Sequence, residues 1–251
     1  MFGSIELIII ILTLTFAGFA KGISGFGLPI ISIPIFTLMI DLQQSVAIII
    51  LTSVFIDLLM AYNKREFYRV QKQRMYTLCI FGIIGTALGT YLLVNLNESI
   101  LQMVLAAIIF VFVLSNIFNL LPQFRNSPPF WSDVLIGIIA GGFQGSTGSS
   151  GPTISMYLMQ IKMNRHAFLF LISIFFTIVG LAQVMTLYVF GFYTIQVAFL
   201  GLLAIIPSSL GFVAANKVQQ FISVKMFRMI ILCLIGTSGV LLVYKSAPNL
   251  F

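Results

Sequence analysis

The chain has 251 residues, of which 60% are hydrophobic and only 8% are charged. Soluble globular proteins have about 25% charged residues, so this chain could not cover its own surface with polar groups in water. Its mean hydropathy of +1.12 places it in a lipid bilayer, and its many apolar residues exclude a disordered or fibrous protein. The length fits one membrane domain of several helices, because each crossing takes about 20 residues.

Long apolar runs, separated by polar or glycine-rich breaks, predict ten helical segments and no strands. The first half contains segments 4–20, 26–40, 44–62, 76–95 and 99–121. The second half contains segments 133–144, 149–161, 167–190, 195–215 and 225–244. These runs do not alternate between apolar and polar residues as membrane β-strands do. We therefore predict an all-α polytopic membrane protein.

Basic residues in the loops predict the orientation. The net charge is +7, and segment 63–75 contains five basic residues against the single acid Glu66. These five are Lys64, Arg65, Arg69, Lys72 and Arg74. Because positive charge gathers in cytoplasmic loops, we place this segment in the cytoplasm, in contact with anionic lipid rather than nucleic acid. The basic loops 122–132, 162–166 and 216–224 join it there, and the uncharged turn 191–192 lies outside.

This alternation holds if segments 4–20 and 26–40 form a pair that returns to its starting side, and if 133–144 and 149–161 do the same. Both termini then lie outside. The first residues contain no Lys or Arg, so they do not form a signal peptide. We expect a multi-pass protein of a bacterial-type plasma membrane.

An internal repeat relates the two halves. A shift of 123 residues aligns 17–32 with 140–155, with seven identities in 16 positions, and a shift of 122 aligns 83–89 with 205–211. The first identities fall at Ala17, Gly18, Gly22, Gly25, Pro29, Ile31 and Ser32. We predict a first repeat at 1–121 and a second at 122–251. Each half has an odd number of crossings, so the repeats are inverted, as in many secondary transporters.

The two glycine-rich breaks also resemble a known family. Ala17-Gly-Phe-Ala-Lys-Gly-Ile-Ser-Gly-Phe-Gly-Leu-Pro29 and Gly141-Gly-Phe-Gln-Gly-Ser-Thr-Gly-Ser-Ser-Gly-Pro152 are similar to the paired motifs of the sulfite exporter TauE/SafE family. The resemblance implies a plasma-membrane permease for sulfite or organosulfonates. The chain departs from the family pattern where consecutive glycines often close each motif, because Phe26-Gly27-Leu28 and Ser149-Ser150-Gly151 stand there.

Both breaks are suited to an anion. Glycine lets a ligand approach the backbone, and Pro29 and Pro152 suit the first turn of a restarting helix, whose free N–H groups attract anions. Serine and threonine hydroxyls add donors. The alternative is that the glycines only allow tight helix packing. The predicted substrate-binding residues are Lys21, Gly22, Ser24, Gly25, Phe26, Gly27, Gln144, Gly145, Ser146, Thr147, Gly148, Ser149, Ser150 and Gly151.

Three polar residues in or beside the apolar segments are predicted to bind the anion or a coupling ion. Lys21 precedes the first break and would attract the anion, unless it extends to a lipid headgroup. Gln144 aligns with Lys21 and would be a neutral donor at the equivalent position. Asp57 could bind a coupling H⁺ or Na⁺, or it could be an interfacial acid that pairs with Lys64 or Arg65. We interpret Gly82, Gly85 and Gly89 as a packing seam.

The leading hypothesis is a secondary transporter, without cofactor or metal, that could form a homodimer. One alternative is an anion channel or a non-transporting membrane subunit. A second is an intramembrane serine hydrolase, because Gly148-Ser-Ser-Gly151 resembles a serine protease motif. Its base would be His166, the only histidine of the chain. We expect His166 and Asp41 to be ordinary loop residues.

The topology is testable by labelling. Single cysteines at Phe67 and Asn249, in a chain without Cys79 and Cys233, should react with a membrane-impermeant thiol reagent from opposite sides of the membrane. Reaction from the same side would contradict the inverted arrangement.

Overall fold

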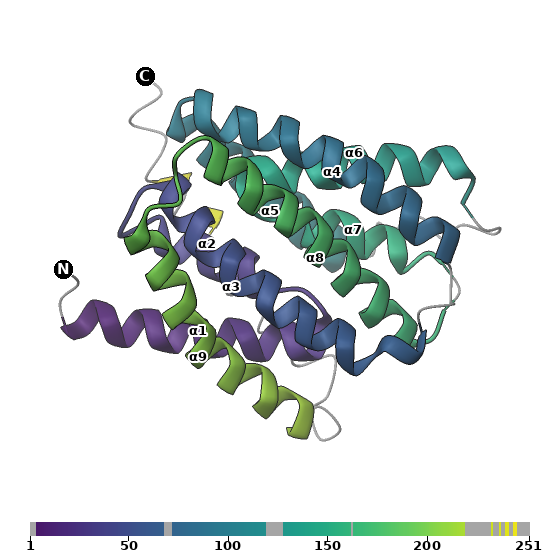
Figure 1. Ribbon diagram of the computed structural model, residues 1–251, viewed down its shortest axis with the longest axis horizontal. Coiled ribbons are helices and arrows are strands. Elements are labelled where there is room, and N and C mark those ends of the chain that lie inside the picture. The colour runs from purple at the N-terminus through teal and green to yellow at the C-terminus, as the bar shows by residue number, and fades with distance from the viewer. Residues whose placement is uncertain are drawn as a thin grey trace.

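The computed structural model describes residues 4–67, 72–118, 128–161 and 163–218, with single residues beyond 231. The described residues form helices and no strand (Figure 1). The helices are α1 (Ser4–Ser24), α2 (Leu28–Phe36), α3 (Leu42–Asn63), α4 (Lys72–Asn95), α5 (Glu98–Ile117), α6 (Phe130–Thr147), α7 (Gly151–Leu158), α8 (Arg165–Val189) and α9 (Ile195–Val218), with the 3₁₀ turn η1 (Arg65–Phe67) after α3.

This architecture confirms the predicted all-α membrane fold. Six of the described helices are long and apolar enough to cross a bilayer, namely α1, α3, α4, α5, α8 and α9. The short helices α2 and α7 follow the two breaks. Most of the predicted segment 225–244 and the basic residues Arg69, Arg125 and Lys162 lie outside the described residues.

The two helix breaks are shorter than predicted. Gly22 and Gly145 lie inside α1 and α6, so the breaks comprise only residues 25–27 and 148–150. The helices continue because both glycines keep helical backbone against a closely packed neighbour. The left-handed backbone begins later, at Gly25 (φ 85°) and Gly148 (φ 71°), where it ends each helix.

The helices restart with proline. Pro29 and Pro152 occupy the first turns of α2 and α7, as predicted. Proline loses nothing there, since the first N–H groups of a helix have no partner within it.

Close backbone contacts join helices from different halves. α1 packs along α9, and α6 packs along α4. A Cβ atom at Gly141 of α6 would overlap the carbonyl oxygen of Gly82, and one at Gly211 of α9 would overlap that of Thr15. These glycines occur in both repeats, since Gly141 aligns with Gly18 and Gly211 with Gly89. Aligned glycines therefore lie at both close contacts, while the division into two repeats at 1–121 and 122–251 stays a prediction.

The two ends of the helix bundle differ in charge. The beginning of α1 and the turn from α8 to α9 lie at the left of Figure 1, while α3 ends and α8 begins at the right. The basic η1 turn follows α3, so it lies opposite the uncharged turn at Gly191. The predicted orientation requires these two loops at opposite ends, and which end faces the cytoplasm stays a prediction.

A polar cluster joins α4, α6 and α7 at the end of the bundle that contains η1. Arg74 Nη1 of α4 donates to Asp133 Oδ1 (2.9 Å) at the beginning of α6 and to the Tyr157 hydroxyl (2.7 Å) in α7. Tyr157 donates in turn to Asp133 Oδ1 (2.6 Å). The repeat offset places the apolar residues Ile10 and Pro34 at the positions of Asp133 and Tyr157. The first half therefore has no matching cluster at these two positions.

Adjacent glycines of α6 provide a matched test of the packing. Gly141→Ala should lower the stability by about 1–3 kcal/mol or more, because the added methyl group must push α4 away. Gly142→Ala should be tolerated, since the nearest atom to its Cβ, the Gly85 carbonyl oxygen, would lie 3.9 Å away. Thermal unfolding of both purified variants measures the difference. Equal midpoints would contradict the close α4–α6 packing.

Candidate functional site

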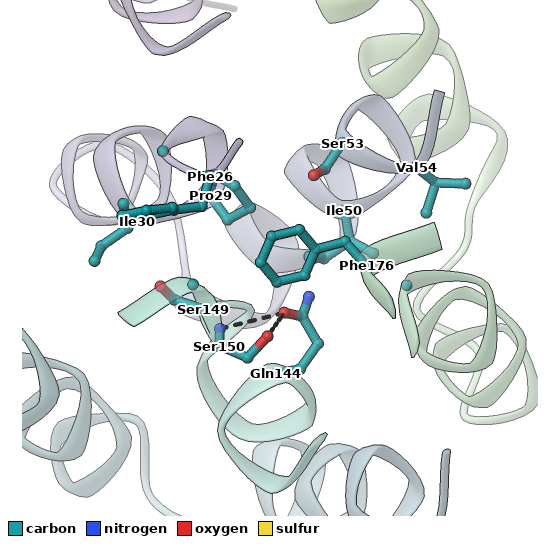
Figure 2. A pocket seen from close by; sticks show the side chains of 13 residues that line it. Phe26, Pro29, Ile30, Ile50, Ser53, Val54, Gln144, Ser149, Ser150 and Phe176 are labelled. Carbon is teal, nitrogen blue, oxygen red and sulfur yellow. Dashed lines mark hydrogen bonds between the residues drawn. The ribbon is translucent and has the colours of Figure 1, made fainter. Parts of the chain in front are cut away.

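The two helix breaks meet at a pocket in the core (Figure 2). The first break packs against the beginning of α7, because a Cβ added at Gly151 would lie 3.1 Å from the ring of Phe26. We call the space between them the central pocket. Its lining residues are Phe26, Gly27, Pro29, Ile30, Ile50, Ser53, Val54, Gln144, Ser149, Ser150, Gly151, Phe176 and Gly180. Its volume of about 10 Å³ holds about one water molecule.

The first turns of α2 and α7 both line this pocket. Gly27 and Pro29 come from the beginning of α2, and Ser150 and Gly151 from the beginning of α7. The free N–H groups of each helix N-terminus carry about half a positive charge. Two such ends on one enclosed space create an environment that favours an anion.

A chain of amide hydrogen bonds orders the second break. Gln144 Oε1 accepts hydrogen bonds from the Ser150 hydroxyl (2.7 Å) and the Ser150 N–H (3.3 Å). Gln144 Nε2 donates to Gln183 Oε1 (3.2 Å) of α8, whose own amide donates to the Gly145 carbonyl (3.1 Å). The buried Ser149 hydroxyl has no protein partner, although Ser149 lines the pocket. Ser149 therefore offers an unused donor.

A buried ion pair stands beside the first break. Lys21 Nζ donates to Asp57 Oδ2 (2.8 Å) and to the Ser53 hydroxyl (2.8 Å), and it lies 5.4 Å from the centre of the Phe176 ring. Ser53 donates to the same carboxylate oxygen at 3.1 Å. Lys21 and Asp57 are both fully buried, while Asp57 Oδ1 has no hydrogen-bond partner. Ser53 and Phe176 connect this pair to the pocket, because both also line it.

These contacts contradict two of the alternatives from the sequence. Lys21 does not extend to a headgroup, and Asp57 does not pair with Lys64 or Arg65, because each is buried against the other. Sequence distance favoured the nearby basic loop. The actual partner lies 36 residues away in the chain and is brought close by the packing of α1 against the other helices.

The aligned residues Lys21 and Gln144 occupy corresponding places with different chemistry. Each lies on the helix before a break and bonds a polar residue on a long helix of the core. Asp57 lies six residues before the end of α3, and Gln183 lies six residues before the end of α8. One half therefore carries a charged pair and the other a neutral amide pair.

The remaining predicted residues lie outside the pocket lining. Gly22 and Gly145 pack against α9 and α4, and Gly25 and Gly148 end their helices. The Ser24 and Thr147 hydroxyls bond the backbone carbonyls of Ala20 and Phe143. Ser146 is buried. The pocket lining thus includes six of the fourteen predicted residues, and Lys21 adjoins it through Ser53 and Phe176.

Sequence reasoning missed Ser53, Phe176 and Gln183. Ser53 could have been found, because it lies one helical turn before Asp57 and therefore on the same face. Gln183 could also have been found, as a polar amide in an apolar membrane helix. Phe176 carried no signal, since it is one of 25 phenylalanines.

The serine hydrolase geometry is not assembled. The Ser150 hydroxyl donates to Gln144, whereas His166 stacks on Phe67 with ring centres 5.7 Å apart. Among the described residues, no three His, Cys, Asp or Glu side chains gather into a metal site. Asp41 is exposed at the beginning of α3.

A double-mutant cycle tests the ion pair. Lys21→Met and Asp57→Asn should each lower the stability by about 3–5 kcal/mol, because each leaves one buried charge without a partner. The double variant should lose much less than the sum, since no unpaired charge remains. Unfolding in a detergent titration gives the coupling energy, with the less buried Lys64→Met as the control. Additive losses would show that the two charges do not depend on each other.

Comparison with known families identifies the chain. The model of the family described as "Sulfite exporter TauE/SafE" matches residues 10–242, which include both breaks and all the described helices except the first turns of α1. No curated protein and no solved structure matches the chain. The sequence motifs, the all-helical membrane fold and this match lead to one conclusion: the chain belongs to the sulfite exporter TauE/SafE family of membrane transporters.

Proposed function

We propose that this protein is a secondary transporter that carries a small organosulfonate or sulfite across a bacterial-type plasma membrane by alternating access. The observation that supports this most is the convergence of two helix N-termini on one enclosed pocket beside a buried Lys–Asp pair. Broken helices at corresponding places in two halves are typical of transporter binding sites.

The donors around the central pocket match a sulfur oxyanion. Three sulfonate oxygens need several hydrogen-bond donors, which the first turns of α2 and α7 and the unpaired hydroxyl of Ser149 would supply. Lys21 lies behind Ser53 and Phe176 and adds positive charge. No guanidinium group lines the pocket among the described residues. The charge therefore comes from helix ends and one lysine.

The apolar part of the lining favours an organosulfonate over sulfite. Phe26, Ile30, Ile50, Val54 and Phe176 surround the same space as the serines. A ligand with an apolar group on its sulfonate would bury that group against these side chains, and each buried CH₂ contributes about 0.8 kcal/mol. Sulfite has no apolar group that these side chains could bury.

The present pocket is too small for such a ligand, so binding requires the helices around it to separate. The Phe176 ring projects into the middle of the pocket, between the first break and Gln144 (Figure 2). A movement of one broken helical pair away from α3 and α8 would open the space on one side at a time. In the cycle that we propose, this geometry would be a closed state between the two open ones.

Asp57 provides a route for coupling to protons. With the anion bound, the buried charges of Lys21, Asp57 and substrate sum to −1, and an uncompensated buried charge is costly. A proton on Asp57 makes the complex neutral, and Oδ1 is free to accept it. We favour H⁺ over Na⁺, because the Asp57 carboxylate already contacts the Lys21 ammonium group and the Ser53 hydroxyl, and among the described residues no three His, Cys, Asp or Glu side chains gather into a metal site.

This coupling predicts the pH dependence of binding. Because the anion favours protonated Asp57, affinity for methanesulfonate should rise as the pH falls, by up to about tenfold per pH unit. Sulfonates stay ionised over the whole range in which proteins are folded, so the ligand itself does not titrate. Calorimetry measures the affinity for methanesulfonate at several pH values. The affinity of Asp57→Asn should no longer depend on pH, whereas Asp57→Glu and the exposed control Asp41→Asn should keep the dependence.

Transport in proteoliposomes completes the test. An inward proton gradient should drive sulfonate accumulation by the unmodified protein and not by Asp57→Asn, which should retain counterflow exchange. Absence of counterflow in the unmodified protein would contradict a carrier and favour a channel. The same pH profile for Asp57→Asn and the unmodified protein would exclude Asp57 as the proton site.

A further inference from the structure

A second cavity lies between helix ends on the side predicted to be cytoplasmic. We call it the basic vestibule, and its volume is about 190 Å³. The residues that line it are Gly22, Met60, Asn63, Lys64, Arg165, His166, Leu169, Phe212 and Asn216. They come from the ends of α1, α3 and α9 and from the beginning of α8, so the vestibule is an opening into the bundle rather than part of its lipid-facing surface.

The vestibule has the chemistry of an anion site. Lys64, Arg165 and His166 supply basic groups, and Asn63 and Asn216 supply amide donors. None of its lining residues is acidic. The side chains of Met60, Leu169 and Phe212 form an apolar surface beside these donors, which fits a ligand with both an oxyanion and a small apolar group.

One turn of α1 separates the vestibule from the central site. Gly22 lines the vestibule, while its neighbour Lys21 bonds Ser53 and Asp57. Arg165 Nη2 donates to the carbonyl oxygen of Ile23 (2.9 Å) in this same turn. The guanidinium group thus contacts both the vestibule and the wall between the two cavities.

We propose that the basic vestibule is a second binding site, specific for organosulfonates, through which the transported anion reaches or leaves the central pocket. An anion there engages Lys64 and the Arg165 guanidinium, which presents a fork of donors suited to oxyanions. That engagement competes with the Arg165–Ile23 hydrogen bond, so occupancy loosens the last turn of α1 beside Lys21. The inference rests on the proposed function, since it names an access site for the same substrate.

The test uses a cysteine at exposed Asn63 in the full-length chain without Cys79 and Cys233, in nanodiscs of neutral phosphatidylcholine. Methanesulfonate should slow the reaction of this cysteine with a neutral thiol reagent. Lys64→Gln and Arg165→Gln should each raise the methanesulfonate concentration required for this protection by about tenfold. Arg165→Lys, which keeps the charge, and Lys217→Gln, which removes a basic residue outside the lining, should preserve much more of it. A cysteine at exposed Gln196, in the first turn of α9, should show no protection.

A variant of the central pocket separates the two sites. Ser149→Ala with Ser150→Ala should weaken transport and leave the protection of the cysteine at position 63 intact. Protection that disappears in this variant would overturn the proposal, because the effect would then come from the central pocket. Protection by anionic lipid but not by methanesulfonate would overturn it in favour of a headgroup site. Protection that persists in a protein without counterflow would support the vestibule and contradict the carrier function.

Discussion

A helix can be interrupted inside a membrane only where other groups cover the freed backbone, and this constraint organises the whole molecule. The interruptions at 25–27 and 148–150 face each other instead of lipid, with Phe26 packed on Gly151. Long helices must therefore enclose them, and α3 packs along α8 with Val54 against Gly180. The close glycine contacts of α1 with α9 and of α4 with α6 hold the interrupted helices in that position.

The two halves use this arrangement differently. The first half places a salt bridge beside its break, and the second places a chain of amides there. The second half is also fixed at one end by Arg74, Asp133 and Tyr157, for which the first half has apolar residues at the two corresponding positions. A common scaffold thus carries one half with a buried charged pair beside its break and one half with neutral amide hydrogen bonds there.

Much of the fold followed from local sequence, because apolar length and glycine–proline breaks are local signals. Pro29 and Pro152 marked the restarts of α2 and α7, because each lies one residue after the first residue of its helix. The ends of α1 and α6 were missed because Gly22 and Gly145 look like helix breakers in isolation. Their role as packing residues depends on Ala215 and Thr86, which are distant in the chain.

The candidate site was predictable in part for the same reason. Phe26, Gly27 and the residues 149–151 follow from their motifs, but the partner of Lys21 does not, because it lies 36 residues away in the chain on another helix. Burial decides such pairings, and burial is a property of the assembled bundle. Ser53 shows how far local sequence can predict the site, because only its position on the same helix face as Asp57 connects it to the site.

The position of the salt bridge along α3 has an electrical consequence. Asp57 lies six residues before the end of a 22-residue helix, which corresponds to about 9 Å of depth, or about a third of a 30 Å hydrocarbon core. A proton that reaches Asp57 from that end crosses only this fraction of the membrane potential. Moving a full elementary charge across 100 mV corresponds to about 2.3 kcal/mol. The membrane potential therefore changes the free energy of protonating Asp57 by about 0.8 kcal/mol. In the proposed cycle the loaded site of Lys21, protonated Asp57 and a monovalent anion is neutral, so the voltage dependence falls on the binding of the two ions rather than on the movement of the loaded site.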